Sequence, residues 1–227
     1  MTVPRPYRLS VYAVFWLFVF LLASGDVTLI KAQTTFSPVP SLGKGQLAVG
    51  VAYSPYRRKI RGDGGGVSNL LDYSRDTVFL DYGLSDQSDL HFELSVADLD
   101  NYRGFELGAG YYGDLGLGSR VGKRPLEAGY FGVLRRSEMS KGSSSSEMFQ
   151  LDAGGGAALF FDPRFAVYAS GLVSYLIGDV DGAGFGAEEL IGVSFGAFYD
   201  HDKKFRFGGE MHLLYESGLS LYGRMTF

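Results

Sequence analysis

The stretch that decides the fold is the last one, GLSLYGRMTF, residues 218–227. Its side chains alternate between an apolar set and a mostly polar set, namely Leu219, Leu221, Met225 and Phe227 against Ser220, Tyr222, Arg224 and Thr226. A period of two is the pattern of a β-strand with two different faces. Chain ends usually fray and carry little pattern, so a regular strand closed by an aromatic residue indicates that this end is built into the fold.

The same period repeats upstream, from about residue 45. In the first such segment Leu47, Val49, Val51 and Tyr53 share one face. Further segments follow near residues 74–83, 89–97, 103–114, 126–136, 147–161, 164–176, 187–199 and 204–215. Each has about the length that a tilted strand needs to cross a bilayer, roughly 9 to 11 residues. The sequence therefore predicts an all-β protein, a transmembrane antiparallel up-and-down β-barrel of about ten strands, with eight or twelve strands also compatible with the pattern.

The second face of these segments distinguishes a membrane barrel from a soluble secreted β-sandwich, the competing fold. A sandwich fills its solvent face with residues such as Lys, Glu and Thr, whereas this face is mostly Gly, Ala and Ser with sparse charges. Small residues suit a narrow lumen, and charges there are expected to pair, because a bare buried charge is costly. We expect a lumen charge network made of Arg75, Asp81, His91, Glu93, Glu106, Glu127, Arg135, Asp152, Arg206, Glu210, His212 and Arg224. Glu188 lies on the same face.

The connections and the aromatic residues indicate how such a barrel lies in a membrane. Connections after the first, fifth and seventh strands are long and polar or glycine-rich, among them residues 137–146 and 177–186, and those after the second, sixth and eighth strands are short turns. Long outer loops and short periplasmic turns are typical of outer-membrane barrels, and an even strand count puts both ends in the periplasm. Tyrosines near the segment ends are expected to form the interfacial girdles: Tyr53, Tyr82, Tyr111, Tyr175, Tyr199 and Tyr215.

The N-terminus has the pattern of a secretory signal peptide. Arg5 and Arg8 precede an unbroken apolar run, residues 11–22, and Ala23-Ser24-Gly25 supplies a small-residue cleavage site. The uncharged stretch is shorter than the roughly 20 residues of a spanning helix. We therefore expect a signal peptide at 1–25, with cleavage after 25 or after 32, a periplasmic N-terminal tail at 26–44 and a barrel at 45–227.

Composition excludes several classes of function. The chain has no cysteine, so disulfides and thiolate metal sites are excluded. Its formal net charge is -4, without the basic excess that nucleic-acid binding requires. We expect no nucleic-acid partner, no cofactor and no metal site.

The closing segment LSLYGRMTF resembles the C-terminal signature of bacterial outer-membrane β-barrels. The resemblance rests on Leu219, Leu221, Met225 and Phe227, with the signal peptide and the repeated strands in support. The resemblance is to small barrels of the OmpA, OmpX and opacity-protein type, and it identifies no subfamily. It implies the outer membrane of a Gram-negative bacterium as location, outer-membrane lipid and lipopolysaccharide as surroundings, and the barrel assembly machinery as the partner that reads the last strand. We expect a monomer.

The sequence leaves the activity open between two classes. The first is a non-catalytic barrel that serves as a structural or adhesive surface protein or as a narrow pore. The alternative is an outer-membrane barrel hydrolase, a protease or a lipid-modifying enzyme, that uses Glu210 and His212. These two residues are two positions apart and so share one face of a strand, where a carboxylate beside an imidazole can do acid–base chemistry.

Overall fold

The computed structural model describes residues 42–62, 69–187, 190–202, 204–214 and 216–227. The expected signal peptide and the expected tail up to residue 41 lie outside the described residues, as do Glu188 and Tyr215. Among the described residues, no helix is long and apolar enough to cross a membrane.

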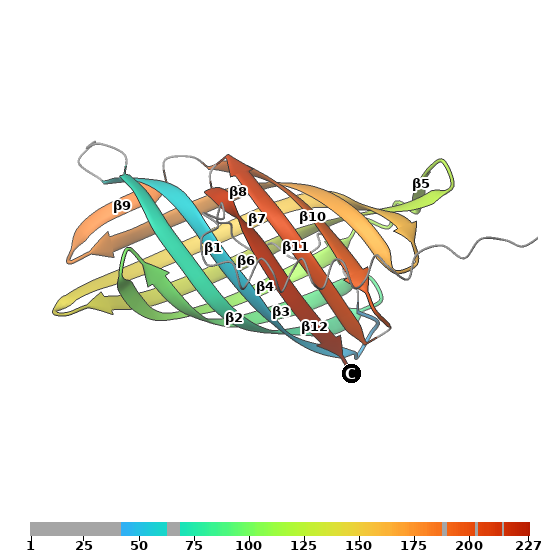
Figure 1. Ribbon diagram of the computed structural model, residues 1–227, viewed down its shortest axis with the longest axis horizontal. Coiled ribbons are helices and arrows are strands. Elements are labelled where there is room, and N and C mark those ends of the chain that lie inside the picture. Colours follow the sequence, from blue (N-terminus) through green and yellow to red (C-terminus); the bar gives the residue numbers. More distant parts are fainter. Residues whose placement is uncertain (1–41, 63–68, 188–189, 203, 215) are drawn as a thin grey trace, which may run out of the picture.

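Ten strands form the wall of a closed barrel (Figure 1). They are β1 (Leu47–Gly62), β2 (Asn69–Ser85), β3 (Ser88–Leu99), β4 (Tyr102–Asp114), β6 (Arg124–Lys141), β7 (Ser144–Asp162), β8 (Phe165–Val180), β10 (Ile191–Asp200), β11 (Phe205–Leu214) and β12 (Glu216–Thr226). Each pairs antiparallel with the next, and β12 closes the barrel by pairing with β1. Two short strands add to this wall: β5 (Ser119–Val121) pairs with the start of β6, and β9 (Ala183–Ala187) joins the end of β8 to the end of β1. The predicted up-and-down barrel of about ten strands is confirmed, and the competing sandwich is wrong.

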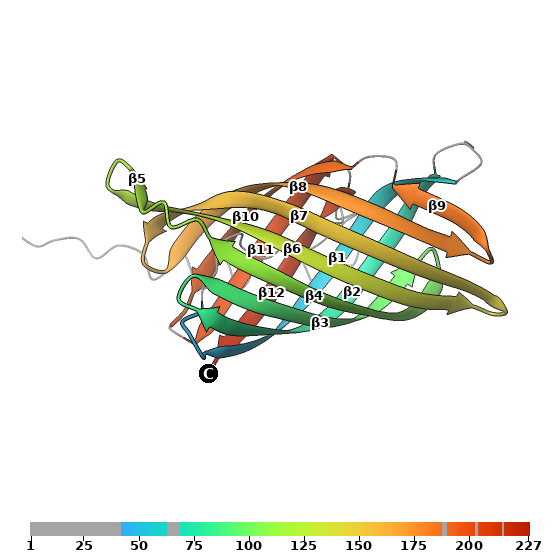
Figure 2. The ribbon, with the colours of Figure 1, turned by 180° about the vertical axis from the view of Figure 1, so that it is seen from behind.

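The barrel has two different ends. We call one the C-terminal rim, because it holds Phe227 together with the turns at 86–87, 163–164 and 201–202; it is on the right in Figure 1. The opposite far rim holds the turns at 100–101, 142–143 and 181–182. Figure 2 shows the hairpin of β5 projecting beyond the C-terminal rim, and β6, β7 and β8 as long strands across the side of the barrel that is turned away in Figure 1.

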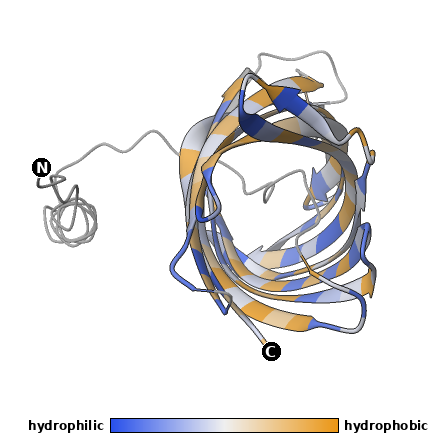
Figure 3. Ribbon diagram, turned by 90° about the vertical axis from the view of Figure 1, so that its right-hand side faces the viewer, coloured by the Kyte–Doolittle hydropathy of each residue, from blue (hydrophilic) through white to orange (hydrophobic). Residues whose placement is uncertain are grey.

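The distribution of side chains is the reverse of that in a soluble protein. Large apolar side chains stand on the outside, such as Val51 (60% exposed), Phe105 (65%) and Ile191 (65%). Charged side chains are buried inside, such as Arg135 (1%) and Glu106 (0%). Figure 3, a view along the barrel, shows hydrophobic and hydrophilic residues alternating along the strands. The predicted outward face, including Val49, is therefore the exposed one.

The prediction of long polar loops at 137–146 and 177–186 is wrong. Strands β6 and β7 continue through the first range to a two-residue turn, Gly142-Ser143, in which Gly142 has φ +63°. In the second range β8 runs to Val180, Asp181-Gly182 turn with φ +51° and +80°, and β9 returns. The first turn has Gly in its first position, and both residues of the second turn have positive φ. These are the features of the two kinds of two-residue hairpin turn whose geometry matches the twist of the strands. Polar composition indicates a loop, but a strand that extends past the lipid can also be polar on its outer face.

Glycines and aromatic rings are paired across strands. At five described positions a ring lies opposite a glycine and covers it: Gly50 with Phe79, Gly113 with Tyr130, Gly178 with Phe185, Gly196 with Tyr168, and Gly208 with Tyr222. A Cβ added at any of these glycines would overlap the ring. We call these the glycine–ring pairs. They account for part of the unusual number of glycines and aromatic residues, since a ring that lies flat over a glycine shields backbone that has no side chain of its own.

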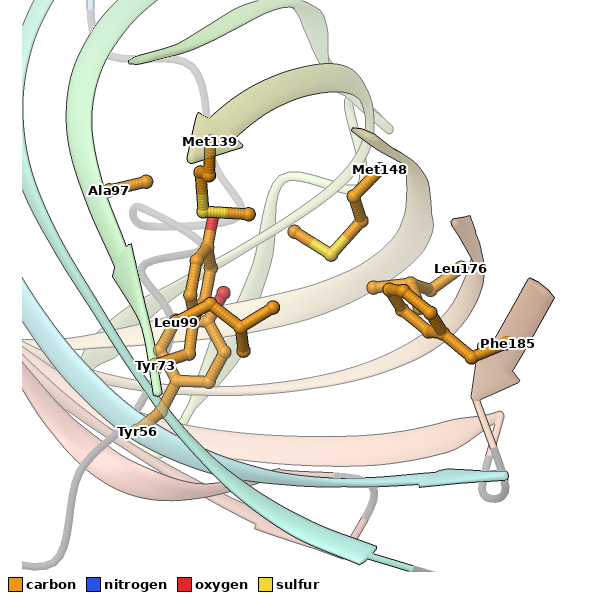
Figure 4. Close-up of a cluster of buried hydrophobic side chains, with 8 residues drawn as sticks. All are labelled: Tyr56, Tyr73, Ala97, Leu99, Met139, Met148, Leu176 and Phe185. Atoms are coloured by element: carbon orange, nitrogen blue, oxygen red, sulfur yellow. The ribbon is translucent and has the colours of Figure 1, made fainter. Parts of the chain in front are cut away.

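Side chains fill the lumen along its length. Toward the far rim lies an apolar cluster from β1, β2, β3, β6, β7, β8 and β9, drawn in Figure 4: Tyr56, Tyr73, Ala97, Leu99, Met139, Met148, Leu176 and Phe185. A small space of about 10 Å³ is lined by six of these residues together with Ile60. Toward the C-terminal rim lies a second cluster with Phe79, Tyr168, Phe198 and Tyr222. Charged residues lie between these clusters.

Candidate functional site: the charged lumen

Arg135 and Arg75 form the centre of the charged lumen. Arg135, on β6, forms ion pairs with Glu93 of β3 and Asp152 of β7. Arg75, on β2, places Nη1 2.5 Å from Glu106 Oε1 and 3.6 Å from Glu93 Oε1. All five side chains are at most 1% exposed in these pairs, so the centre of the lumen is closed to water.

Register explains how side chains from separate strands meet here. Glu93 lies opposite Gly108 of β4, and Gly108 lies opposite Arg135 of β6. A Cβ at position 108 would collide with the Glu93 carboxylate. Because Gly108 has no side chain, Glu93 reaches across β4 to the guanidinium of Arg135.

A branch of the same network runs through His91 toward the C-terminal rim. His91 Nδ1 lies 2.6 Å from Asp81 Oδ1, and His91 Nε2 lies 3.1 Å from Glu93 Oε2. The other Asp81 oxygen, Oδ2, lies 3.5 Å from Arg224 Nη1. A continuous chain of contacts therefore leads from β12 through β2 and β3 to β6 and β7. We call the residues of this series of contacts, together with Arg75 and Glu106, the lumen network.

The lumen network also includes neutral partners that the sequence analysis missed. Tyr73 Oη and Ser137 Oγ each donate to Glu106 Oε2 at 2.7 Å. Gln150 Nε2 donates to Asp152 Oδ2 at 2.8 Å. Their signal was available, because all three occupy inward positions of the same alternation. Only charged residues had been counted.

Charge balance makes burial of the lumen network tolerable. With His91 as a cation, four positive groups face four carboxylates: Arg75, His91, Arg135 and Arg224 against Asp81, Glu93, Glu106 and Asp152. Buried charges persist only when paired and hydrogen-bonded. The arrangement can therefore hold the strands in register and block the lumen.

Glu210 and His212 form a separate pair on β11. The His212 imidazole contacts the Glu210 carboxylate, and Tyr168 Oη donates to Glu210 Oε2 at 2.6 Å. Both side chains of the pair are buried, at 0% exposure. The pair is enclosed by the barrel wall.

The remaining expected members lie near the C-terminal rim. Arg206 donates to both Asp200 oxygens, Nε to Oδ1 at 2.7 Å and Nη2 to Oδ2 at 2.9 Å, with its guanidinium 3.8 Å from the Phe198 ring centre. Glu127 is exposed at the start of β6, apart from the lumen network. Within the described ranges, no group of three or more His, Cys, Asp or Glu side chains is arranged to hold a metal ion.

The expected assembly signal lies on the outer face of β12, at the seam. β12 pairs with β11 on one side and β1 on the other. The backbone N–H of Phe227 donates to the Leu47 carbonyl at 2.7 Å, and the Phe227 side chain is 64% exposed. Leu219, Leu221 and Met225 are partly exposed.

The chain matches no protein-family model and no curated protein. Among solved structures it is similar to an outer membrane channel from Pseudomonas putida F1, with 12% identity over 86% of this chain and 100% of that chain and a TM-score of 0.45. Neisserial surface protein A has 14% identity over 82% and 100%, with a TM-score of 0.41. The translocator domain of the autotransporter NalP from Neisseria meningitidis has 11% identity over 96% of each chain, with a TM-score of 0.47. None of them identifies a subfamily.

Proposed function

We propose that this chain is an integral β-barrel protein of the outer membrane of a Gram-negative bacterium, non-catalytic and with an occluded lumen. Its role is structural or adhesive, through the hairpins of the far rim. The observation that carries the proposal is the inverted barrel: apolar side chains cover the wall outside, and the charged ones are buried inside. Such a wall is stable only in lipid, where a closed barrel also satisfies every backbone hydrogen bond.

The proposed surroundings follow from this wall. Outer-membrane lipid contacts the apolar exterior, lipopolysaccharide surrounds the far rim, and the barrel assembly machinery reads the last strand. The far rim faces outward, because the C-terminal rim holds Phe227 and the start of β1. The protein acts as a monomer.

A narrow pore is less well supported than an occluded barrel. Ions would have to pass Arg75, Arg135 and Glu106, which are at most 1% exposed and bonded to one another or to their neighbours. Their burial favours a lumen that does not conduct.

The hydrolase alternative has geometry against it. His212 and Glu210 are enclosed by the barrel, and the carboxylate also accepts a hydrogen bond from Tyr168. A catalytic base must come within hydrogen-bond reach of a substrate proton, and a fully buried pair offers a substrate no such approach. The pairing therefore supports a structural role for these two residues.

Planar-bilayer conductance of the purified protein tests the occluded lumen. We expect insertion without discrete current steps. The double variant Glu93→Ala with Arg135→Ala removes one carboxylate and one cation from the centre, and it serves as the control that should conduct. Reproducible steps from the unaltered protein would overturn the proposal of an occluded lumen.

Epitope insertion tests the orientation and the membrane location. A tag inserted between Gly142 and Ser143 should bind antibody on intact cells, and a tag between Asp86 and Gln87 should bind only after the outer membrane is opened. Equal labelling of both tags, or recovery of the protein in the soluble fraction, would contradict the proposal.

A further inference from the structure

The C-terminal rim contains a hollow with an excess of positive charge. It has a volume of about 570 Å³ and is lined by Gln46, Pro163, Arg164, Asp200, Asp202, Lys204, Phe205, Arg206, Arg224 and Thr226. We call it the rim hollow. Its volume falls within the range of small-molecule sites, roughly 300 to 1,000 Å³. Four of its lining residues are cationic and two are acidic.

Two arginines face each other inside the rim hollow. Arg206 of β11 and Arg224 of β12 are direct partners in the antiparallel register, and both side chains are about nine-tenths buried. Like charges directly opposite each other on neighbouring strands are destabilising. The register therefore places two guanidinium groups side by side in the lining of the hollow.

The acidic residues nearby pair with these arginines or with other partners, and Arg164 and Lys204 add two further cations to the lining. Asp200 pairs with Arg206, which donates hydrogen bonds to both of its carboxylate oxygens. Asp202 accepts the backbone N–H groups of Lys204 and Phe205 at 2.7 and 2.9 Å. Asp81 is shared between His91, at 2.6 Å from Oδ1, and Arg224, whose Nη1 lies 3.5 Å from Oδ2.

Donor groups remain available in the rim hollow. Arg224 Nε is buried without a hydrogen-bond partner among the described residues. Gln46 uses its side-chain oxygen to accept the Gly43 N–H at 3.0 Å, which leaves its amide N–H groups as donors. Arg164 and Lys204 are exposed at the edge. Planar guanidinium groups with further N–H donors suit the oxygens of phosphate or carboxylate groups.

We propose that the rim hollow is a binding site for a small oxyanion, with phosphate as the simplest member of the class. The anion lies between Arg206 and Arg224 and relieves their repulsion, and Lys204 and Arg164 attract it at the entrance. Arg206 and Arg224 are about nine-tenths buried, which suits a small free solute better than a bulky lipid headgroup. The site requires neither conduction nor a particular orientation of the barrel, so its test is independent of the proposed function.

Thermal unfolding of the purified protein in a neutral detergent measures this binding. The probe is inorganic phosphate, titrated against sodium chloride at constant ionic strength. A ligand that binds only the folded state raises the unfolding midpoint with the logarithm of its concentration above Kd. We expect a rise that phosphate produces and chloride does not. A midpoint that follows ionic strength alone would overturn the proposal.

Arg224→Gln locates the site. The substitution removes a charged donor, and the apparent Kd for phosphate should rise about tenfold, the loss expected for one charge-assisted hydrogen bond. If Arg224 serves only to balance Asp81, the variant will lose the same stability with and without phosphate, which would contradict the proposal. Should Arg224→Gln not fold, Lys204→Gln at the exposed edge should still weaken the phosphate response, and an unchanged response would overturn it.

A matched control separates the site from general charge. Arg120→Gln with Lys123→Gln removes two cations of the β5 hairpin, next to the same rim but outside the hollow. We expect this variant to keep the phosphate response. A second arm replaces phosphate by phosphatidylglycerol in the micelles; stabilisation by this lipid and not by phosphate would show a headgroup site and would overturn the proposal of a free anion.

Discussion

Arg135 and Arg136 are neighbours in sequence with opposite environments. Arg135 is buried between Glu93 and Asp152, and Arg136 stands 53% exposed on the outer face beside Glu138 and Glu147. Removal of one partner from a buried ion pair costs about 3–5 kcal/mol, because the remaining charges lose their neutralisation. Arg135→Met should therefore lower the free energy of unfolding by about that amount, as measured by urea titration in lipid vesicles.

Arg136→Met is the matched control, since exposed pairs contribute about 0–1 kcal/mol. Equal losses in the two variants would contradict the role assigned to the lumen network.

The variant His212→Ala tests whether the pair of Glu210 and His212 stabilises the folded protein. His212→Ala leaves the buried Glu210 carboxylate without its imidazole partner, and the free energy of unfolding should fall by about 3 kcal/mol. Adding Glu210→Gln removes the stranded charge and should recover part of the loss, which a double-mutant cycle measures. Independent, additive losses would show that the two side chains are not coupled.

Sequence could assign residues to the inside of the barrel but could not pair them. A period of two indicates the face of each side chain, and His91, Glu93 and Arg135, which it assigns to the inner face, are buried. The height of a residue in the lumen depends on strand register, which the length of each hairpin sets. An interpretation of 137–146 as a loop leaves no basis for pairing Arg135 with Asp152. Glu127 was assigned by face alone and lies exposed at the rim.

Each glycine–ring pair makes a prediction about the strands that it joins. Gly208→Ala would push the Tyr222 ring, which is 7% exposed, off its strand. Overpacking of this kind costs about 1–3 kcal/mol. The loss should be visible in urea unfolding followed by circular dichroism.

Gly171→Ala is the comparison for this variant. A Cβ at Gly171 would have no atom within 4 Å, and the residue faces outward. Its effect should stay within about 0.5 kcal/mol. A Gly208 variant that is equally harmless would show that the ring moves away at no cost.

The turn between β10 and β11 has a predictable pH dependence. The pKa of Asp202 is lowered from its ordinary value of 3.8 because its carboxylate accepts the backbone N–H groups of Lys204 and Phe205. A lowered pKa in the folded state stabilises the protein above pH 3.8, and this contribution is lost as the pH falls through the lower folded value. Asp202→Asn should therefore flatten the fall in thermal midpoint as the pH is lowered below about 4. If the thermal midpoints of the unaltered protein and of Asp202→Asn fall in parallel with pH, the Asp202 carboxylate does not stabilise the turn.

The hairpin turns show what the sequence analysis of the elements overlooked. Asp181-Gly182 is among the strongest short hairpin signals, and Gly142 precedes Ser143 in the other tight turn. Both lie within stretches whose polar composition was given more weight than the turn residues. Strand extension beyond the lipid cannot be inferred from hydrophobic alternation, because the outer face loses its apolar character there.

At the scale of the whole molecule, the seam where the barrel closes allows two properties to be tested separately. They are the stability of the folded barrel and its assembly in the outer membrane. Phe227 lies at the seam, and its side chain is 64% exposed. Phe227→Ala should change the unfolding free energy of the refolded protein by no more than about 0.5 kcal/mol. In cells, we expect several-fold less heat-modifiable barrel in the outer membrane, because the assembly signal is weakened. Normal assembly of this variant would contradict the role assigned to the last residue.

The architecture could be predicted because it depends on repetition. Ten segments with one apolar face each predict a closed barrel whatever the register, and the pairing of β12 with β1 completes it. The rim hollow could not be predicted in this way. Arg206 and Arg224 belong to separate segments, and only the register of β11 against β12 shows that they face each other.

The glycine–ring pairs also constrain how this protein can change over evolutionary time. In each pair, the ring on one strand occupies the space that a side chain at the glycine on the neighbouring strand would need. A larger residue at the glycine is therefore tolerated only after the ring opposite has become smaller. Among descendants of this sequence the two positions should drift together, with glycine retained wherever its partner stays aromatic. Tyr168 and Gly196, or Tyr222 and Gly208, should therefore be inherited as couples. Such couples would remain recognisable after the lipid-facing residues around them have been exchanged many times.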